Sequence, residues 1–263
     1  VPQSVWRWKI ASYLFLAGMG AGSYISGVYA NWIGNAFPGR VGIVLGVVLV
    51  AMSTIFLISD LGVPGQFYLA FSKPGKSWIS RGTWILTSFI IIGLIQIGLS
   101  VWPLQVIGTT GPAAVTLYTL GILFALATSL YTGLLIGVLP GRPFWYSPII
   151  PVIFLASAIS TGIGAFILLI TVLNLLGQPF SNAQLFPLIE SLARIDIVLI
   201  LAEALAIYLH LVIASRKAGD SVKALISGRL AGFFWGGLVG VGLFLPLVLD
   251  IMSTLSLSES AKL

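Results

Sequence analysis

The sequence predicts an all-α protein, a polytopic transmembrane bundle of about seven helices. Of its 263 residues 58% are hydrophobic and only 8% are charged, and the mean hydropathy is +1.09. Soluble domains contain about a quarter charged residues. Because each span needs about 20 apolar residues, the chain has the length for one bundle with short loops. We therefore expect a single integral membrane domain over 1–263, located as a multi-pass protein in the cell membrane.

Seven apolar stretches, each bounded by proline, glycine or charged residues, are the predicted spans. They cover 10–33, 41–59, 83–102, 113–139, 149–173, 192–215 and 230–249. The N-terminal segment VPQSVWRWK lacks the pattern of a cleavable signal peptide, so the first stretch is interpreted as a span. The tail STLSLSESAKL is short and polar, so the sequence predicts no eighth span.

Seven spans put the N-terminus and the loops after the second, fourth and sixth spans on one side of the membrane, here called face A. Face A receives Arg7, Lys9, Lys73, Lys76, Arg81, Arg142, Arg216, Lys217, Lys223 and Arg229, and the opposite face B receives Arg40, Arg194 and Lys262. The asymmetry supports the number of helices, and the positive-inside rule predicts a cytoplasmic face A. Because the basic residues are scattered at span ends, they predict a membrane protein and no nucleic-acid partner.

The composition limits the prosthetic groups that we expect. The chain has no cysteine, so it has no thiolate ligands for an iron–sulfur cluster. His210 is its only histidine, whereas a haem in a membrane bundle commonly takes two, and zinc sites need several ligands. We therefore expect no haem, no iron–sulfur cluster and no metal site in this chain.

Small residues recur at spacings that let transmembrane helices approach each other closely. They are Gly18 and Gly22 in the first span, Ser160 and Gly164 in the fifth, and Gly232, Gly236 and Gly240 in the seventh. We interpret these residues as helix-packing positions. The run GMGAG lies within a span with no preceding strand, so it does not indicate a dinucleotide-binding loop.

Three ionisable residues occur in the sixth span, at Asp196, Glu203 and His210. Their spacing of seven places them on one helix face with a drift of only ~20° per heptad, over about 21 Å of helix axis. Ionisable groups within a membrane are functional candidates by default, so we predict a proton path. The alternative is that Asp196 pairs with Arg194 or Arg40 and that His210 only marks a helix end.

A second group of polar residues is predicted to gather at face A. Its members are Tyr13, Asp60, Arg81, Tyr131 and His210. Phenol, imidazole and carboxyl groups suit a quinone, whose carbonyl oxygens accept hydrogen bonds and whose reduction requires protons. The alternatives are an ion pair between Asp60 and Arg81 in a hairpin, and tyrosines that belong to the interfacial aromatic belt.

Several ordered segments carry a resemblance to a known family. They are WRWKIASYLFLAGMGAGSYISG, the Asp-Leu-Gly of SDLGVPGQFY, SWISRGTWIL, YTGLLIGVLPGRPFWYSPIIPVIFLASAISTGIGAF and RIDIVLILAEAL. With these motifs the protein resembles the membrane subunit of polysulfide reductase and its NrfD-like relatives, over most of its length. The family pattern has eight spans, one more than the seven predicted here.

The resemblance implies a quinone-reactive anchor that binds menaquinone or another quinone as substrate. It further implies a ferredoxin-like iron–sulfur partner subunit and a molybdopterin catalytic subunit that acts on a sulfur compound. The quinone-site tyrosine of the fourth span corresponds to Tyr131. Ile10 and Tyr13 stand where polysulfide reductase has asparagine and histidine, so only Tyr13 could donate a hydrogen bond there.

The orientation and two rival functions stay open at this point. The family places its catalytic subunits outside the cytoplasm, next to the quinone at face A, which opposes the charge count unless the basic residues form a docking surface. A secondary transporter or ion channel that uses buried Asp196, Glu203 and Arg81 is the alternative function. A retinal protein is excluded because the seventh span has no lysine, and a haem-bearing anchor conflicts with the single histidine.

Overall fold

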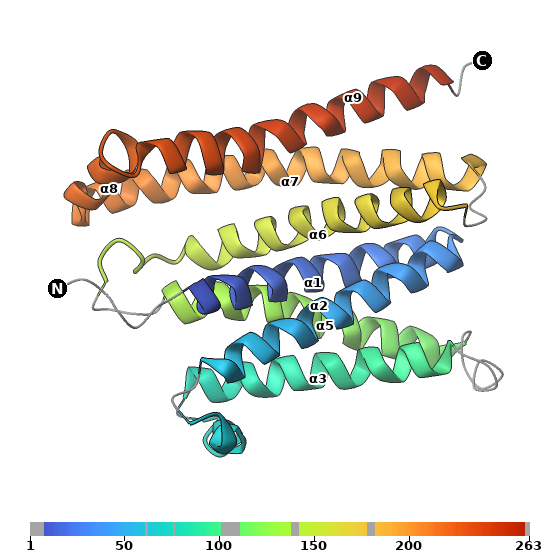
Figure 1. Cartoon of the computed structure of the whole chain (residues 1–263), viewed down its shortest axis with the longest axis horizontal. Coiled ribbons are helices and arrows are strands. Elements are labelled where there is room, and N and C mark those ends of the chain that lie inside the picture. The colour runs from blue at the N-terminus through green and yellow to red at the C-terminus, as the bar shows by residue number, and fades with distance from the viewer. Residues whose placement is uncertain are drawn as a thin grey trace.

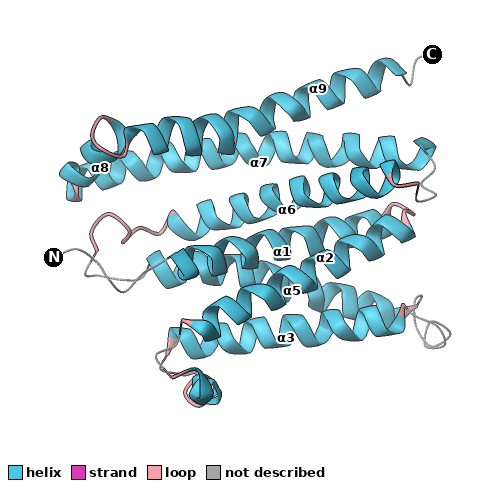
Figure 2. Cartoon of the chain, in the orientation of Figure 1, coloured by secondary structure: helices cyan, strands magenta, loops and turns pink. Residues whose placement is uncertain are grey.

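The computed structural model describes residues 8–60, 63–75, 77–100, 111–137, 142–177 and 182–260. Within these ranges the protein is helical and contains no strand, which confirms the all-α prediction (Figure 2). The long helices lie roughly side by side, so the bundle has two ends (Figure 1). The start of α1 (Trp8–Trp32) and the short helix α8 (Gly219–Ile226) lie at one end, and the end of α9 (Leu245–Ser260) lies at the other.

The remaining helices are α2 (Ala36–Ser59), the 3₁₀-helix η1 (Pro64–Phe71), α3 (Trp78–Leu99), α5 (Pro112–Gly137), α6 (Ile150–Leu175), α7 (Asn182–Lys217) and the π-helix η2 (Phe233–Phe244), which continues into α9. Their ends follow local chemistry. The hydroxyl of Ser77 caps α3 by accepting a 3.4 Å hydrogen bond from the amide of Ser80. Arg216 and Lys217 occupy the last turn of α7, where a cation interacts favourably with the helix dipole.

Within the described ranges, six helices are long and apolar enough to cross a membrane: α2, α3, α5, α6, α7 and the continuous η2–α9 segment. The seventh predicted span, α1, is 25 residues long but contains many glycines and serines, and it does not belong to this apolar set. It nevertheless lies at the centre of the bundle (Figure 1). The prediction of about seven spans is therefore approximately right.

The predicted bounds of the last two spans differ from those in the structure. Helix α7 has 36 residues and begins ten residues before the predicted start at 192. The last apolar segment runs over Phe233–Ser256, and α9 stays helical to Ser260, so the prediction that the span stops at 249 is wrong. The physical reason is that a helix can include serine and threonine residues when apolar residues continue on both sides of them, as they do in α9. As a consequence, Asp250 lies within a membrane-spanning segment.

The packing places α1 between three partners. It contacts α2, α5 and α6, whereas α3 contacts α2 and α5. Helix α7 lies between α6 and α9 (Figure 1). One cluster of buried apolar residues joins α1, α2, α3 and α5, and a second joins α6 and α7 to the last turns of α1. The η1 helix, the 142–149 loop and α8 lie at the same end as the start of α1, as the predicted face A requires.

Close helix packing occurs at only some of the predicted small residues. A Cβ at Gly22 would overlap the backbone of Ala158 on α6, and one at Gly18 would lie 3.2 Å from the Ala158 Cβ. These two packing positions are confirmed. Gly164, Gly232 and Gly236 have open space around them, and Gly240 only faces its own helix. The prediction of close packing at these glycines is wrong. Gly164 lies on a face of α6 that meets no neighbouring atoms, and η2 lies on the outside of the bundle, where no other described helix covers that face.

Candidate functional site

Two tyrosines meet in the core near face A. Tyr13 of α1 is 0% exposed and Tyr131 of α5 is 3% exposed. Their side chains are neighbours in one buried cluster. The two side chains lie within range of electrostatic interaction with each other, and the Tyr13 hydroxyl has no hydrogen-bond partner in the described part of the protein. A buried polar group left unpaired costs about 1–3 kcal/mol, so this phenol is available to a ligand that accepts a hydrogen bond.

A glycine on α3 makes room for one of these rings. A Cβ at Gly82 would overlap the ring and hydroxyl of Tyr131. The phenol ring of Tyr131 therefore packs directly against the α3 backbone at Gly82, the residue that follows Arg81 in the sequence. The hydroxyl of Ser80, two residues before Gly82, is also buried without a hydrogen-bond partner among the described residues. The motif SRGTW thus supplies both the space for Tyr131 and a second free hydroxyl on α3.

The structure does not pair Asp60 with Arg81. The Arg81 guanidinium donates hydrogen bonds to the carbonyl oxygens of Pro74 (2.9 Å) and Gly75 (3.1 Å). It also lies 4.6 Å from the centre of the Trp78 ring. Asp60 follows the last turn of α2. The hairpin ion pair considered from the sequence is therefore absent, and Arg81 instead fixes the loop that leads into α3.

The three residues of the predicted proton path on α7 are all buried, as their spacing on one helix face predicts. Asp196 is 3% exposed, Glu203 is 8% exposed and His210 is 5% exposed. Asp196 lies beside Ser160 of α6, and Glu203 lies beside Ser157 of the same helix. The alternative in which Asp196 pairs with Arg194 is wrong, because Arg194 forms an ion pair with Glu190.

A fourth ionisable residue, which the sequence analysis missed, joins this series. Asp250 of α9 lies beside Asp196, and each carboxyl group has one oxygen buried without a hydrogen-bond partner within the described ranges. The sequence contained a signal for this residue, because Asp250 is an acidic residue within an apolar run, with Leu249 before it and Ile251 and Met252 after it. It was overlooked because the last span was predicted to end at 249.

His210 is separate from the tyrosine pair. It lies on α7, which packs against α6, α8 and α9, whereas Tyr13 and Tyr131 lie between α1 and α5. Both imidazole nitrogens are buried without a hydrogen-bond partner in the described residues. The ring of Phe144 stands edge-on to the imidazole, with 5.3 Å between the ring centres. The polar residues of face A therefore form two groups and not one.

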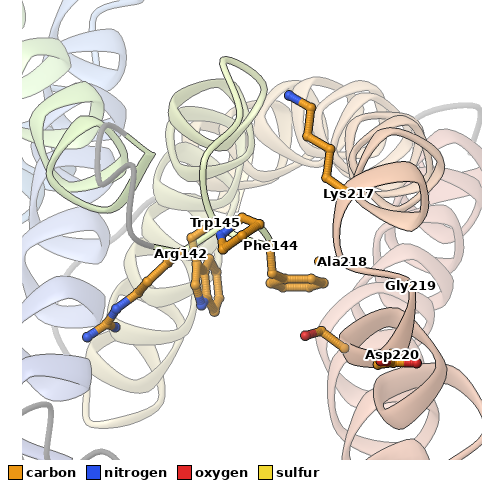
Figure 3. A pocket seen from close by; sticks show the side chains of 9 residues that line it. Arg142, Phe144, Trp145, Lys217, Ala218, Gly219 and Asp220 are labelled. Carbon is orange, nitrogen blue, oxygen red and sulfur yellow. The ribbon is translucent and has the colours of Figure 1, made fainter.

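A pocket of about 490 Å³ opens at face A between the 142–145 loop and residues 217–221 at the junction of α7 and α8 (Figure 3). The Phe144 ring lies between the loop and Ala218, while the charged ends of Arg142 and Lys217 point away from it. The Lys217 ammonium lies 5.9 Å from the centre of the Tyr146 ring. The pocket is therefore lined by aromatic and small residues, with the basic residues Arg142 and Lys217 at its rim and the carboxylate of Asp220 in its wall.

The bundle of long apolar helices with buried carboxyl groups defines a multi-pass α-helical membrane protein. The sequence model of the family described as polysulphide reductase, NrfD, matches residues 1–262. The protein therefore belongs to the NrfD and polysulfide reductase family, which confirms the resemblance found in the motifs.

Individual relatives agree with this assignment. The protein is 32% identical to the C subunit of polysulfide reductase from Wolinella succinogenes, over 94% of its own length and 83% of that subunit. It is 27% identical to the protein NrfD of Escherichia coli, over 93% of its own length and 84% of that protein. It is 24% identical to the NrfD homolog of Haemophilus influenzae, over 95% of its own length and 84% of that protein.

Proposed function

We propose that this protein is the quinone-reactive membrane anchor of a respiratory oxidoreductase that acts on a sulfur compound. It exchanges electrons between menaquinone or another quinone and a docked ferredoxin-like iron–sulfur subunit, which serves a molybdopterin catalytic subunit. Family membership supports a subunit of a membrane-bound redox complex, because the relative from Wolinella succinogenes is by name one component of polysulfide reductase.

The observation that carries the quinone assignment is the buried hydroxyl of Tyr13 beside Tyr131. A quinone carbonyl oxygen accepts a hydrogen bond, and a phenol can donate one at neutral pH. Tyr13 has no protein partner for its hydroxyl within the described ranges, so a quinone carbonyl would satisfy it. Reduction of the quinone to quinol takes up two electrons, which the iron–sulfur partner supplies, and two protons, which must reach the quinone oxygens.

The carboxyl groups of α7 are the proposed source of those protons. Asp196, Glu203 and His210 form a series along one helix face, and Asp250 adds a second carboxyl group at the end nearer face B. Glu203 is the central member, and its closest described polar neighbour is the hydroxyl of Ser157. We propose that the series feeds protons toward face A, and that in a pumping variant it moves them across the membrane.

The basic residues of face A fit a docking surface. Lys9, Lys73 and Lys217 lie at this end of the bundle, together with the basic rim of the pocket. An acidic partner would be drawn to such a surface, because complementary charge speeds association and fixes orientation. This interpretation agrees with the family orientation, in which the partner subunits bind on the side where the quinone reacts.

The test compares three tyrosines in the purified complex. Tyr131→Phe and Tyr13→Phe should each lower kcat/KM for a quinol about tenfold, the kinetic equivalent of one lost hydrogen bond of ~1.4 kcal/mol. Tyr24→Phe is the matched control, because the Tyr24 hydroxyl donates a 2.7 Å hydrogen bond to Gln96. It should lower the free energy of unfolding by about 1 kcal/mol and leave quinol turnover near the parent value.

Two outcomes would overturn the proposal. One is quinol turnover in Tyr13→Phe and Tyr131→Phe that equals turnover in Tyr24→Phe. The other is a protein that purifies from mild detergent without an iron–sulfur subunit or quinone and moves a solute in liposomes. That second result would favour the transporter alternative, in which Asp196 and Glu203 bind the transported species.

A further inference from the structure

The pocket at face A lies directly outside the last member of the α7 series. Phe144 lines this pocket, and its ring is also the edge-on neighbour of His210 at 5.3 Å. His210 itself does not line the pocket. The Phe144 ring therefore borders both the solvent-open pocket, where Figure 3 shows it, and the buried imidazole of His210.

The imidazole of His210 has no hydrogen-bonding group in reach among the described residues. A neutral imidazole has one donor nitrogen and one acceptor nitrogen, and neither nitrogen of His210 has a hydrogen-bond partner in the described part of the protein. The hydrocarbon ring of Phe144 offers none. Two unpaired buried nitrogens are costly, and water that entered from the pocket would pair them.

The segment that carries Phe144 allows its ring to turn without unfolding the loop. The backbone amides of Trp145 and Tyr146 each donate a 3.0 Å hydrogen bond to the carbonyl of Arg142. The turn is thus held by its own backbone, and the side chain of Phe144 is only half-buried, next to Trp145. The ring can change its rotamer while the turn remains closed.

We propose that this pocket is the aqueous vestibule through which His210 exchanges protons with the face A solution, and that the Phe144 ring is its hydrophobic cover. The inference rests on the proposed proton path and identifies where that path reaches the solution at face A. With the ring turned aside, water from the pocket reaches an imidazole nitrogen. Asp220, in the pocket wall, supplies a carboxylate that accepts hydrogen bonds from water at the opening.

The absence of cysteine makes a direct test possible, because an introduced cysteine is the only thiol of the protein. The His210→Cys variant in membrane vesicles is treated with a membrane-impermeant methanethiosulfonate, and labelling is followed by the mass of the protein. A buried thiol reacts slowly because its reactive thiolate form is disfavoured. Combining His210→Cys with Phe144→Ala should raise the labelling rate from the face A side at least about tenfold, because the cover is removed.

Two matched controls separate an opened cover from a loosened bundle. Ala206→Cys is equally buried on α7, four residues deeper than His210, and Phe144→Ala should not change its rate. Ser221→Cys lies in the pocket wall and is exposed, so it should be labelled rapidly with or without Phe144. Phe144→Leu, which keeps an apolar cover, should give an intermediate rate at position 210 and serves if the alanine variant does not fold.

Equal labelling of His210→Cys with and without Phe144 would overturn the vestibule, as would labelling that comes only from face B. Acceleration at Ala206→Cys equal to that at His210→Cys would overturn it too, because the bundle would then simply have loosened. The labelling requires neither quinone nor partner subunits. A failure of the quinone or proton proposals would therefore appear in turnover while the labelling result stood unchanged.

Discussion

Two helix interfaces of the same bundle treat polar groups in opposite ways. Where α1 meets α6, the hydroxyl of Ser23 donates hydrogen bonds to the carbonyls of Met19 (2.8 Å) and Gly162 (3.2 Å). Where α7 meets α9, Asp196 and Asp250 lie beside each other, and each keeps one oxygen unpaired among the described residues. The first interface uses polar groups to hold helices together, and the second leaves two carboxyl oxygens unpaired among the described residues.

The residue sizes at the two interfaces explain this difference. Gly22 and Gly162 let the backbones of α1 and α6 approach so closely that a Cβ on either would overlap the other helix. No water or ligand fits there. The α7–α9 interface instead holds carboxyl groups, and a charge within a membrane is costly unless it is paired, hydrated or protonated. The helix that carries Tyr13, α1, is therefore closely packed against α6, while the carboxyl series lies on α7 and α9 in the outer part of the bundle.

The largest effect is expected from Gly22→Ala. The new Cβ would overlap the carbonyl of Ala158, so the α6 backbone must move, and we expect a loss of about 3 kcal/mol or more in the free energy of unfolding. Gly18→Ala is the control, because its Cβ would lie 3.2 Å from the Ala158 Cβ and needs only a small shift. Thermal unfolding in detergent measures both. Equal melting temperatures for the two variants would show that the close approach does not stabilise the bundle.

The next effect concerns the carboxyl series. Glu203→Gln removes the proposed central proton carrier but keeps the size of the side chain, so we expect proton uptake coupled to quinone reduction to fall about tenfold or more. Proteoliposomes that contain the complex and a pH indicator give the measurement. Glu190→Gln, which only breaks the ion pair with Arg194, is the control and should retain coupling. Intact coupling in Glu203→Gln would sink the proton path.

A smaller and opposite pair of effects is expected beside Asp196. Asp250→Asn removes a like charge, so we expect the free energy of unfolding to rise by about 1 kcal/mol while coupled turnover falls severalfold. Ser160→Ala removes the neighbouring hydroxyl and should instead lower stability by about 1 kcal/mol. Unfolding in detergent and proton uptake are measured on both variants. A destabilised Asp250→Asn would show that the second carboxyl group serves structure and not proton transfer.

The smallest effect is expected from Gly236→Ala in η2. This glycine has open space around it, so the methyl group meets no neighbour, and the lost flexibility of the unfolded state should add about 0.5 kcal/mol to stability. The same substitution is thus expected to be severe at Gly22 and harmless at Gly236. A strongly destabilised Gly236→Ala would indicate that another surface covers η2 in the assembled complex.

The sequence predicted the membrane class and the approximate number of helices because hydrocarbon thickness fixes the length of an apolar span. It also placed Asp196, Glu203 and His210 on one buried face, since a spacing of seven is a property of a single helix. The motifs predicted the family. Each of these conclusions depends on local composition or on the geometry of one helix, which the linear sequence contains.

The tertiary structure decided which residues of different helices meet. Identical glycine spacings became a close contact at Gly22 and open surface at Gly236, because α1 lies in the centre of the bundle and η2 lies on its outside. Asp250 joined Asp196 because α9 packs along α7, and His210 separated from Tyr13 because α7 packs away from α1. Contacts between helices depend on how the spans are arranged around one another, and hydropathy carries no information about that arrangement.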